Sequence, residues 1–360
     1  MPIVLAILVF CVIIIIHELG HFLAAKACGI YVKEFALGMG PVIFRKQGKE
    51  TCYVIRLLPI GGSCSMEGEN GGYEEELDSA GNVIERPVNP RAFNRKPVWQ
   101  RMIVILAGPL MNLILGYFAV MLSLCTSTAM ASTTISSFRE EPVSSSFLQV
   151  DDKILSIDGM TVFSASDISY KLQSSDRKNA EGNLVFDFKV KRNGETVMLK
   201  DVEFKTTEND NGTNGIYFDF YVYRLEKNFK NVVSQSFMES CSTGRLIIMT
   251  LIDMLRGKYG INEMSGPVGV VSVVSQSVSY GFSTFMNLVS LITINVGVFN
   301  LIPIPALDGC RFLFLLIEAI RRKPTKPEVE GMVHFAGFAL LMLLMIVVTV
   351  NDVIRLINGG

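Results

Sequence analysis

Two histidines and a glutamate near the N-terminus carry the clearest chemistry in this sequence. His17 and His21 stand four residues apart, and Glu18 follows the first of them. On an α-helix this spacing places both imidazoles on one face, where they can share a tetrahedral zinc ion. Glu18 is turned about 100° around the helix axis. It can therefore reach a metal-bound water without being a ligand, as the general base of a metalloprotease does.

The surroundings of this motif make a functional reading stronger than a chance match. Residues 1–25 form an apolar run that is long enough to cross a bilayer. An ionisable residue inside a spanning helix costs at least about 2.5 kcal/mol, so it rarely persists without a role. The pattern favours a zinc site at membrane depth, with a site for a transported metal as the alternative.

Composition indicates membrane spans combined with a soluble module. Of the 360 residues, 49% are hydrophobic and only 19% are charged. A formal net charge of −1 gives no basic field, so nucleic acid is not an expected partner. The seven cysteines form no short-spaced metal pair and no disulfide framework.

Hydropathy predicts four transmembrane helices, at residues 3–27, 98–124, 282–304 and 332–350. Basic clusters follow the first span, precede the second and follow the third, and all three fall on one side of the bilayer. That side is expected to be cytoplasmic, which places the N-terminus and residues 125–280 outside.

The segments between the spans suggest further elements. Residues 35–65 are strand-like and broken by Gly and Pro, which predicts a membrane-reentrant β-hairpin on the cytoplasmic side. Residues 125–225 contain strand-like stretches of alternating apolar and polar residues separated by turn signals, which predicts a PDZ-like β-rich domain. Residues 226–281 are expected to lie along the outer membrane surface as an amphipathic helical segment.

The fold class is therefore a multi-pass α-helical membrane protein with an inserted extracytoplasmic β-rich domain. We divide the chain into a first membrane half (1–124), a PDZ-like domain (125–225), a membrane-surface segment (226–281) and a second membrane half (282–360).

A catalytic zinc ion needs a third protein ligand. Asp308 follows an apolar span that Pro303 and Pro305 interrupt, and it stands near the depth inferred for His21. It can also begin the next helix as its N-cap. His334, the remaining histidine, opens the fourth span and is interpreted as an interfacial residue.

Five motifs together resemble the site-2 protease family, in its bacterial RseP/RasP type with a single PDZ domain. They lie at residues 17–21, 38–41, 107–112, 265–269 and 300–309. The family usually has Phe where Met39 stands and an aromatic residue where Ser63 stands.

The resemblance implies an intramembrane zinc metalloprotease. His17, His21 and Asp308 would bind one Zn²⁺, and Glu18 would be the catalytic base. Residues expected to shape the substrate site are Asn112, Asn300, Pro303 and Pro305.

It also implies partners and a location. The enzyme would lie in the lipid bilayer of the bacterial cytoplasmic (inner) membrane. It would cut single-span membrane proteins, such as anti-sigma factors or signal-peptide remnants, after an upstream site-1-type protease has acted. A membrane metal carrier and a non-catalytic PDZ scaffold are the alternatives from other functional classes.

Overall fold

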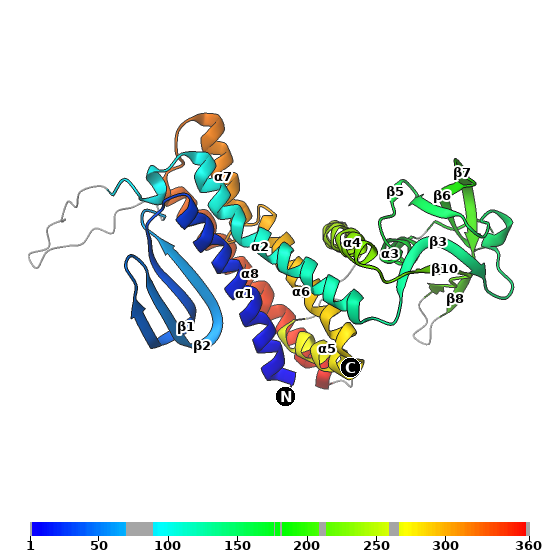
Figure 1. Ribbon diagram of the computed structural model, residues 1–360, viewed down its shortest axis with the longest axis horizontal. Helices are drawn as coiled ribbons and strands as arrows, with labels where there is room; N and C mark the ends of the chain where they lie inside the picture. Colours follow the sequence, from blue (N-terminus) through cyan, green and yellow to red (C-terminus); the bar gives the residue numbers. More distant parts are fainter. Residues whose placement is uncertain are drawn as a thin grey trace, which may run out of the picture. The chain divides into compact units, whose positions relative to one another are not determined.

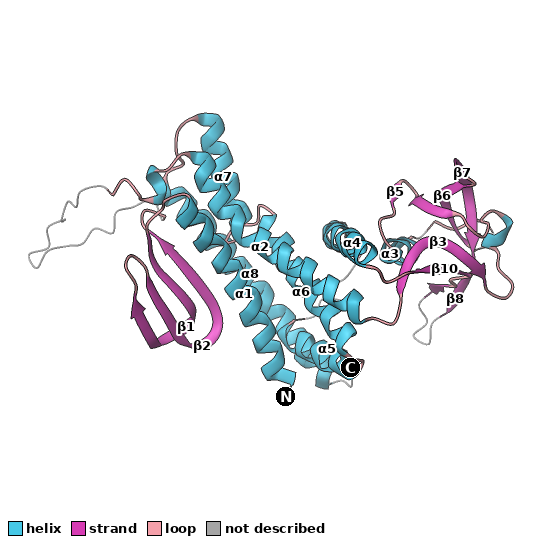
Figure 2. Ribbon diagram, viewed as in Figure 1, coloured by secondary structure: helices cyan, strands magenta, loops and turns pink. Residues whose placement is uncertain are grey.

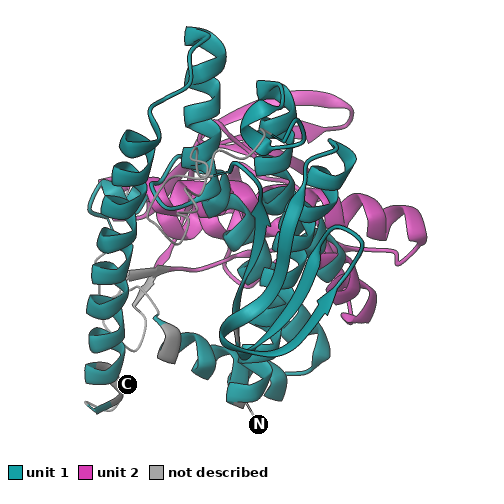
Figure 3. Ribbon diagram, turned by 90° about the vertical axis from the view of Figure 1, so that its left-hand side faces the viewer, with its two compact units in different colours: residues 1–119, 253–360 teal, residues 120–252 magenta. Residues whose placement is uncertain are grey.

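The chain folds into two compact units. The computed structural model describes residues 2–69, 89–175, 177–180, 182–208, 214–258 and 266–357. One unit consists of residues 1–119 and 253–360, and the other of residues 120–252 (Figure 3). Helices dominate the first unit, and strands make up much of the second (Figure 2).

Four helices among the described residues are long and apolar enough to cross a membrane, which confirms the four expected spans. They are α1 (Pro2–Ala27), α2 (Val98–Thr126), α6 (Phe282–Leu301) and α8 (Pro327–Ile357). The remaining helices of this unit are α5 (Pro267–Ser279), α7 (Asp308–Arg321) and the short η1 (Phe93–Arg95).

The expected end of the third span and the expected start of the fourth span were each wrong by several residues. Helix α6 stops at Leu301 rather than at residue 304, because Ile302 is extended and the prolines that follow cannot donate to a helix. Helix α8 begins at Pro327 rather than at residue 332, since proline fits the first turn of a helix.

A sheet of two long strands lies beside α1 (Figure 1). Strands β1 (Val32–Gln47) and β2 (Cys52–Met66) each bend, and each pairs with the other along more than one stretch. Leu37, for example, has both Gly62 and Ile55 as partners. The last part of β2, residues 62–66, therefore lies at an edge of the sheet, with residues 32–37 on its inner side.

Small residues let the helices of the first unit approach closely. A Cβ atom on Gly20 would lie 2.4 Å from the Ala107 carbonyl oxygen, so α1 and α2 meet backbone to backbone there. A Cβ atom on Gly116 would lie 2.4 Å from Ile294 Cγ1, so the Ile294 side chain of α6 packs directly against the α2 backbone. Such contacts are typical of helices packed in lipid, where van der Waals packing replaces the hydrophobic effect.

A buried ion pair fastens α7 to α2. Arg101 places its two terminal nitrogens 3.0 and 2.5 Å from the carboxylate oxygens of Glu318, and both side chains are at most 14% exposed. A bidentate pair fixes both the distance and the orientation of the two helices. Because α7 begins with Asp308, this pair helps to position the candidate ligand.

The second unit contains a sheet in the order β10–β3–β4–β6–β7 (Figure 1). Its strands are β3 (Met130–Phe138), β4 (Lys153–Ile157), β6 (Leu184–Arg192), β7 (Glu195–Phe204) and β10 (Phe220–Leu225). The short β5 (Met160–Thr161) pairs with β4, and β8 (Thr206–Glu208) pairs with β9 (Asn214–Ile216). Phe186, Phe188 and Phe204 form the centre of its core. Two further short elements are η2 (Ser144–Ser146) and α3 (Ala165–Ser174).

Helix α4 (Phe229–Leu255) joins this second unit through a buried carboxylate. Asp167 is fully buried, and it accepts hydrogen bonds from Ser242 at 2.5 Å and pairs with Arg245 at 2.6 Å. A buried carboxylate needs such partners, so α4 is held against α3. The expected helical segment 226–281 is thus divided, because α5 groups with the first unit. That this segment lies on the membrane surface stays a prediction.

Candidate metal centre

The two histidines of α1 face the same space, as their spacing predicts. The Nε2 atoms of His17 and His21 lie 3.2 Å apart, and the rings meet edge to face with centroids 4.8 Å apart. Helix geometry alone brings them together, since residues four apart lie on one face.

Asp308 joins them from the first turn of α7. Its Oδ2 atom lies 3.0 Å from His17 Nε2 and 3.3 Å from His21 Nε2. The three side chains are 9–18% exposed. Among the described residues, this is the group of His, Cys, Asp and Glu side chains that could hold a metal ion.

The three distances suit a tetrahedral zinc ion. Ligand atoms about 2.0–2.1 Å from zinc stand about 3.3 Å from one another in a tetrahedron. The observed separations of 3.0, 3.2 and 3.3 Å are close to that value. Two imidazoles and one carboxylate therefore fit zinc in both donor type and spacing, and they leave the fourth position open.

Backbone and amide groups orient both imidazoles. His21 Nδ1 donates to the Val104 carbonyl oxygen at 2.8 Å, which leaves Nε2 as the free lone pair facing Asp308. Asn112 is fully buried, and its amide nitrogen lies 3.2 Å from His17 Nδ1. The Oδ1 atom of the same amide has no hydrogen-bond partner among the described residues.

Glycines make room for the reactive side chains. A Cβ atom on Gly108 of α2 would lie 2.3 Å from His21 Nε2, and one on Gly62 of β2 would lie 2.9 Å from Glu18 Cγ. A larger residue at either position would displace the His21 ring or the Glu18 side chain, which occupy the space.

A cavity of about 330 Å³ adjoins this cluster. The edge of β2 forms one wall, and Glu18 also faces the cavity. It is lined by His17, Glu18, His21, residues 62–66, Glu69, Ile105, Asp308 and Arg311. Burial raises the pKa of the Cys64 thiol in this wall to about 12, so the thiol stays protonated at neutral pH.

The other expected site residues are not among those that line this cavity. Asn300 is in the last turn of α6, and Pro303 and Pro305 form the turn that leads to Asp308. Asn112 is buried against His17. Contact of Asn112, Asn300, Pro303 and Pro305 with the substrate stays a prediction. The motif residue Ser265 lies outside the described residues.

Comparison with known proteins supplies a family and an activity. A family model described as Peptidase family M50 matches residues 5–344. The chain is 32% identical to the zinc metalloprotease RasP of Shouchella clausii, with 97% of this chain and 98% of the relative covered. It is also 32% identical to the regulator of sigma-W protease RasP of Bacillus subtilis, with 97% of each covered. A putative zinc metalloprotease of Clostridium acetobutylicum is 34% identical, with 99% and 98% covered.

Replacing Gly108 by alanine tests the close approach of α2 to His21. The added methyl group would overlap the imidazole, so Gly108→Ala is expected to weaken zinc affinity at least about tenfold, as other disturbances of ligand orientation do. Zinc affinity is measured by competition with a chromophoric chelator on the purified protein in detergent. Gly331→Ala on α8 is the matched control, because its Cβ meets nothing within 4 Å. Equal zinc affinity in the two variants would contradict the assigned contact.

Proposed function

We propose, from the premise that this chain belongs to peptidase family M50, that His17, His21 and Asp308 bind its zinc ion. The chain is an integral membrane zinc metalloprotease that acts in regulated intramembrane proteolysis. We therefore favour a protease over the two alternatives, a membrane metal carrier and a non-catalytic scaffold. The single observation that supports the ligand assignment most strongly is the set of three short separations among the two histidines of α1 and Asp308 of α7.

Asn112 serves this centre by orienting His17. For His17 Nε2 to bind metal, Nδ1 must carry the ring proton and needs an acceptor. A half-turn of the Asn112 amide exchanges its nitrogen and oxygen and presents the unpartnered Oδ1 to Nδ1. His17 and His21 would then both donate from Nδ1, one to Asn112 and the other to Val104.

Glu18 acts as general base and then as general acid. When bound, zinc activates a water molecule and polarises the peptide carbonyl. Glu18 lines the cavity and is not one of the three candidate ligands, so its carboxylate is available for proton transfer. It takes the proton of the attacking water and delivers it to the nitrogen of the leaving amine.

The edge of β2 holds the substrate in an extended form. A transmembrane helix hides its carbonyl groups in internal hydrogen bonds, so it must unwind before attack. Residues 62–66 line the cavity and pair with β1 on their inner side, which leaves the other side for a substrate strand. Asn300, Pro303 and Pro305 would border the same path from the turn before Asp308.

The substrates and the outer domain complete the proposal. The name of the Bacillus subtilis relative, a regulator of sigma-W protease, supports single-span membrane proteins such as anti-sigma factors as the substrate class. An upstream site-1-type protease would trim them first. The second unit would be a PDZ-like domain outside the cytoplasmic membrane that docks or filters substrates, because its sheet and α3 suit strand addition.

Glu18→Gln tests the base. The substitution keeps the size of the side chain but removes its proton affinity, so cleavage of a single-span test substrate in detergent is expected to fall about 10²–10⁴-fold. Zinc content, measured by mass spectrometry, should stay near one ion per chain. Glu34→Gln, which loses an ion pair with Arg56 and does not line the cavity, is the control and should cleave normally. Loss of zinc in Glu18→Gln, or cleavage within a few-fold of wild type, would refute this role.

Substrate sequence tests the unwinding step. Replacing leucine by glycine in the cleaved stretch of a test substrate lowers helix stability by about 1 kcal/mol per residue, so each glycine should raise the cleavage rate about fivefold. Initial rates are compared by gel assay. The same replacement in the opposite half of the span should change little. Equal rates for a poly-leucine span and a glycine-containing span would mean that unwinding does not limit cleavage.

A further inference from the structure

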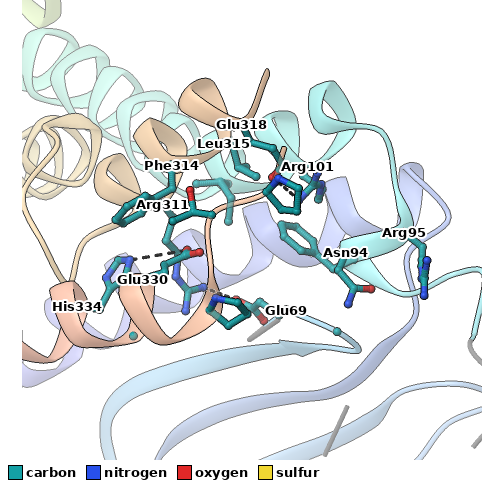
Figure 4. A pocket seen from close by; sticks show the side chains of 17 residues that line it. Glu69, Asn94, Arg95, Arg101, Arg311, Phe314, Leu315, Glu318, Glu330 and His334 are labelled. Atoms are coloured by element: carbon teal, nitrogen blue, oxygen red, sulfur yellow. Dashed lines mark hydrogen bonds and ion pairs between the residues drawn. The ribbon is translucent and has the colours of Figure 1, made fainter. Parts of the chain in front are cut away.

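The third histidine of the chain contacts the turn that carries Asp308. His334 lies in the second turn of α8, and its Nδ1 atom accepts the backbone N–H of Ala306 at 3.1 Å. Since Nδ1 accepts, the neutral ring carries its proton on Nε2. Glu330, one turn earlier on α8, places Oε1 4.0 Å from that Nε2, and Phe314 packs 6.0 Å from the ring (Figure 4).

This contact is made at a strained point of the backbone. Ala306 has φ +76°, a left-handed conformation that is costly for a residue with a side chain. Pro303 and Pro305 have no N–H to donate, and Leu307 closes the turn by donating its N–H to the Ile304 carbonyl oxygen at 3.1 Å. The amide of Ala306 donates to α8, across the turn, rather than within the turn.

Helix α8 also packs tightly against the same turn. A Cβ atom on Gly337 would lie 2.2 Å from Pro305 Cβ. His334 and Gly337 are three residues apart and therefore share a face of α8. Neighbouring side chains point elsewhere: Phe335 is 73% exposed and Phe338 is 56% exposed. One narrow face of α8 thus holds the turn between α6 and α7.

The turn leads directly to the metal centre. Asp308 follows Ala306 by two residues, and its carboxylate reaches both imidazoles of α1. The residue after Asp308 is also closely packed against the start of the turn, since a Cβ atom on Gly309 would lie 2.2 Å from the Ile302 carbonyl oxygen. A change in the backbone at Ala306 is therefore passed on to the carboxylate.

We infer that His334 is a positioning residue for Asp308. By accepting the N–H of Ala306, it holds the left-handed turn that directs the Asp308 carboxylate toward His17 and His21. His334 is not itself part of the candidate ligand group. This inference rests on the proposed role of Asp308 as a zinc ligand. It also gives a role to a histidine whose sequence position suggests only an interfacial residue.

The His334 side chain lies between the turn at Ala306 and a second cavity. Toward Ala306 it supports the metal centre, and on its other side it lines a cavity of about 570 Å³ with Glu330, Arg311 and Glu69 (Figure 4). Arg311 pairs with Glu69, and both residues also line the cavity of the metal centre. His334 is thus placed beside the catalytic cavity without facing the candidate zinc position.

Zinc affinity of His334 variants tests the inference. In His334→Asn the amide oxygen takes the place of Nδ1 and can accept the same N–H, whereas His334→Leu cannot accept it. With full-length protein in detergent and a chromophoric chelator as competitor, H334L is expected to bind zinc about 10–100-fold more weakly, and H334N within about threefold of wild type. Phe335→Leu, at the exposed neighbouring position, is the control and should bind zinc normally.

A second variant distinguishes support of the turn from general packing. Glycine adopts the left-handed conformation without strain, so Ala306→Gly in the H334L background should recover part of the lost zinc affinity. Should H334L not give folded protein by size-exclusion chromatography, His334→Ala removes the acceptor without added bulk and takes its place.

Two results would overturn the inference: H334L that binds zinc like wild type, or equal losses in H334L and H334N. Asp308→Ala separates this failure from failure of the proposed function. If D308A loses zinc while H334L keeps it, only the role of His334 is wrong. If D308A also keeps its zinc, the ligand assignment itself is wrong.

Discussion

The approach of two imidazoles and one carboxylate to a common point is the interaction on which the rest of the structure depends. His17 and His21 belong to a helix made mostly of apolar residues, and Asp308 begins a helix nearly three hundred residues later in the chain. Polar groups in such surroundings are costly unless they are paired or bind a metal. A zinc ion bound as we propose would satisfy all three at once, and the other features of the first unit keep them close together.

Several unrelated features of the fold serve this one requirement. Glycines at 20 and 108 bring α2 against α1, so that the Val104 carbonyl can fix the tautomer of His21. The buried pair of Arg101 and Glu318 holds α7 to α2. The prolines before Asp308 end α6 and force a turn, and that turn is supported by α8. The edge of β2 lies along the same cavity, where we propose that it holds the substrate.

The sequence predicts the parts of this structure that arise from local patterns. Four apolar stretches give four spanning helices, and histidines four apart share a face, so both could be recognised without a structure. Asp308 could be proposed as the third ligand from its place after a span interrupted by prolines and its inferred depth, and the family resemblance supported that choice; the distances to the histidines needed the structure, because spacing along the chain does not measure distance in space. Contacts made by backbone atoms could not be predicted from the sequence. The carbonyl of Val104 and the amide of Ala306 are groups that almost any residue type would supply. Residues 226–281 divide between the two units, because the buried carboxylate of Asp167 on α3, far away in sequence, binds Arg245 and holds α4 in the second unit.

Zinc K-edge X-ray absorption of the purified protein in detergent tests the central claim most directly, since it reports the atoms around the ion rather than activity. We predict one zinc per chain with nitrogen and oxygen neighbours at about 2.0–2.2 Å, including the multiple-scattering signature of two imidazoles, and loss of this spectrum in Asp308→Ala. A shell of sulfur atoms at about 2.3 Å, or an unchanged spectrum in D308A, would contradict the account.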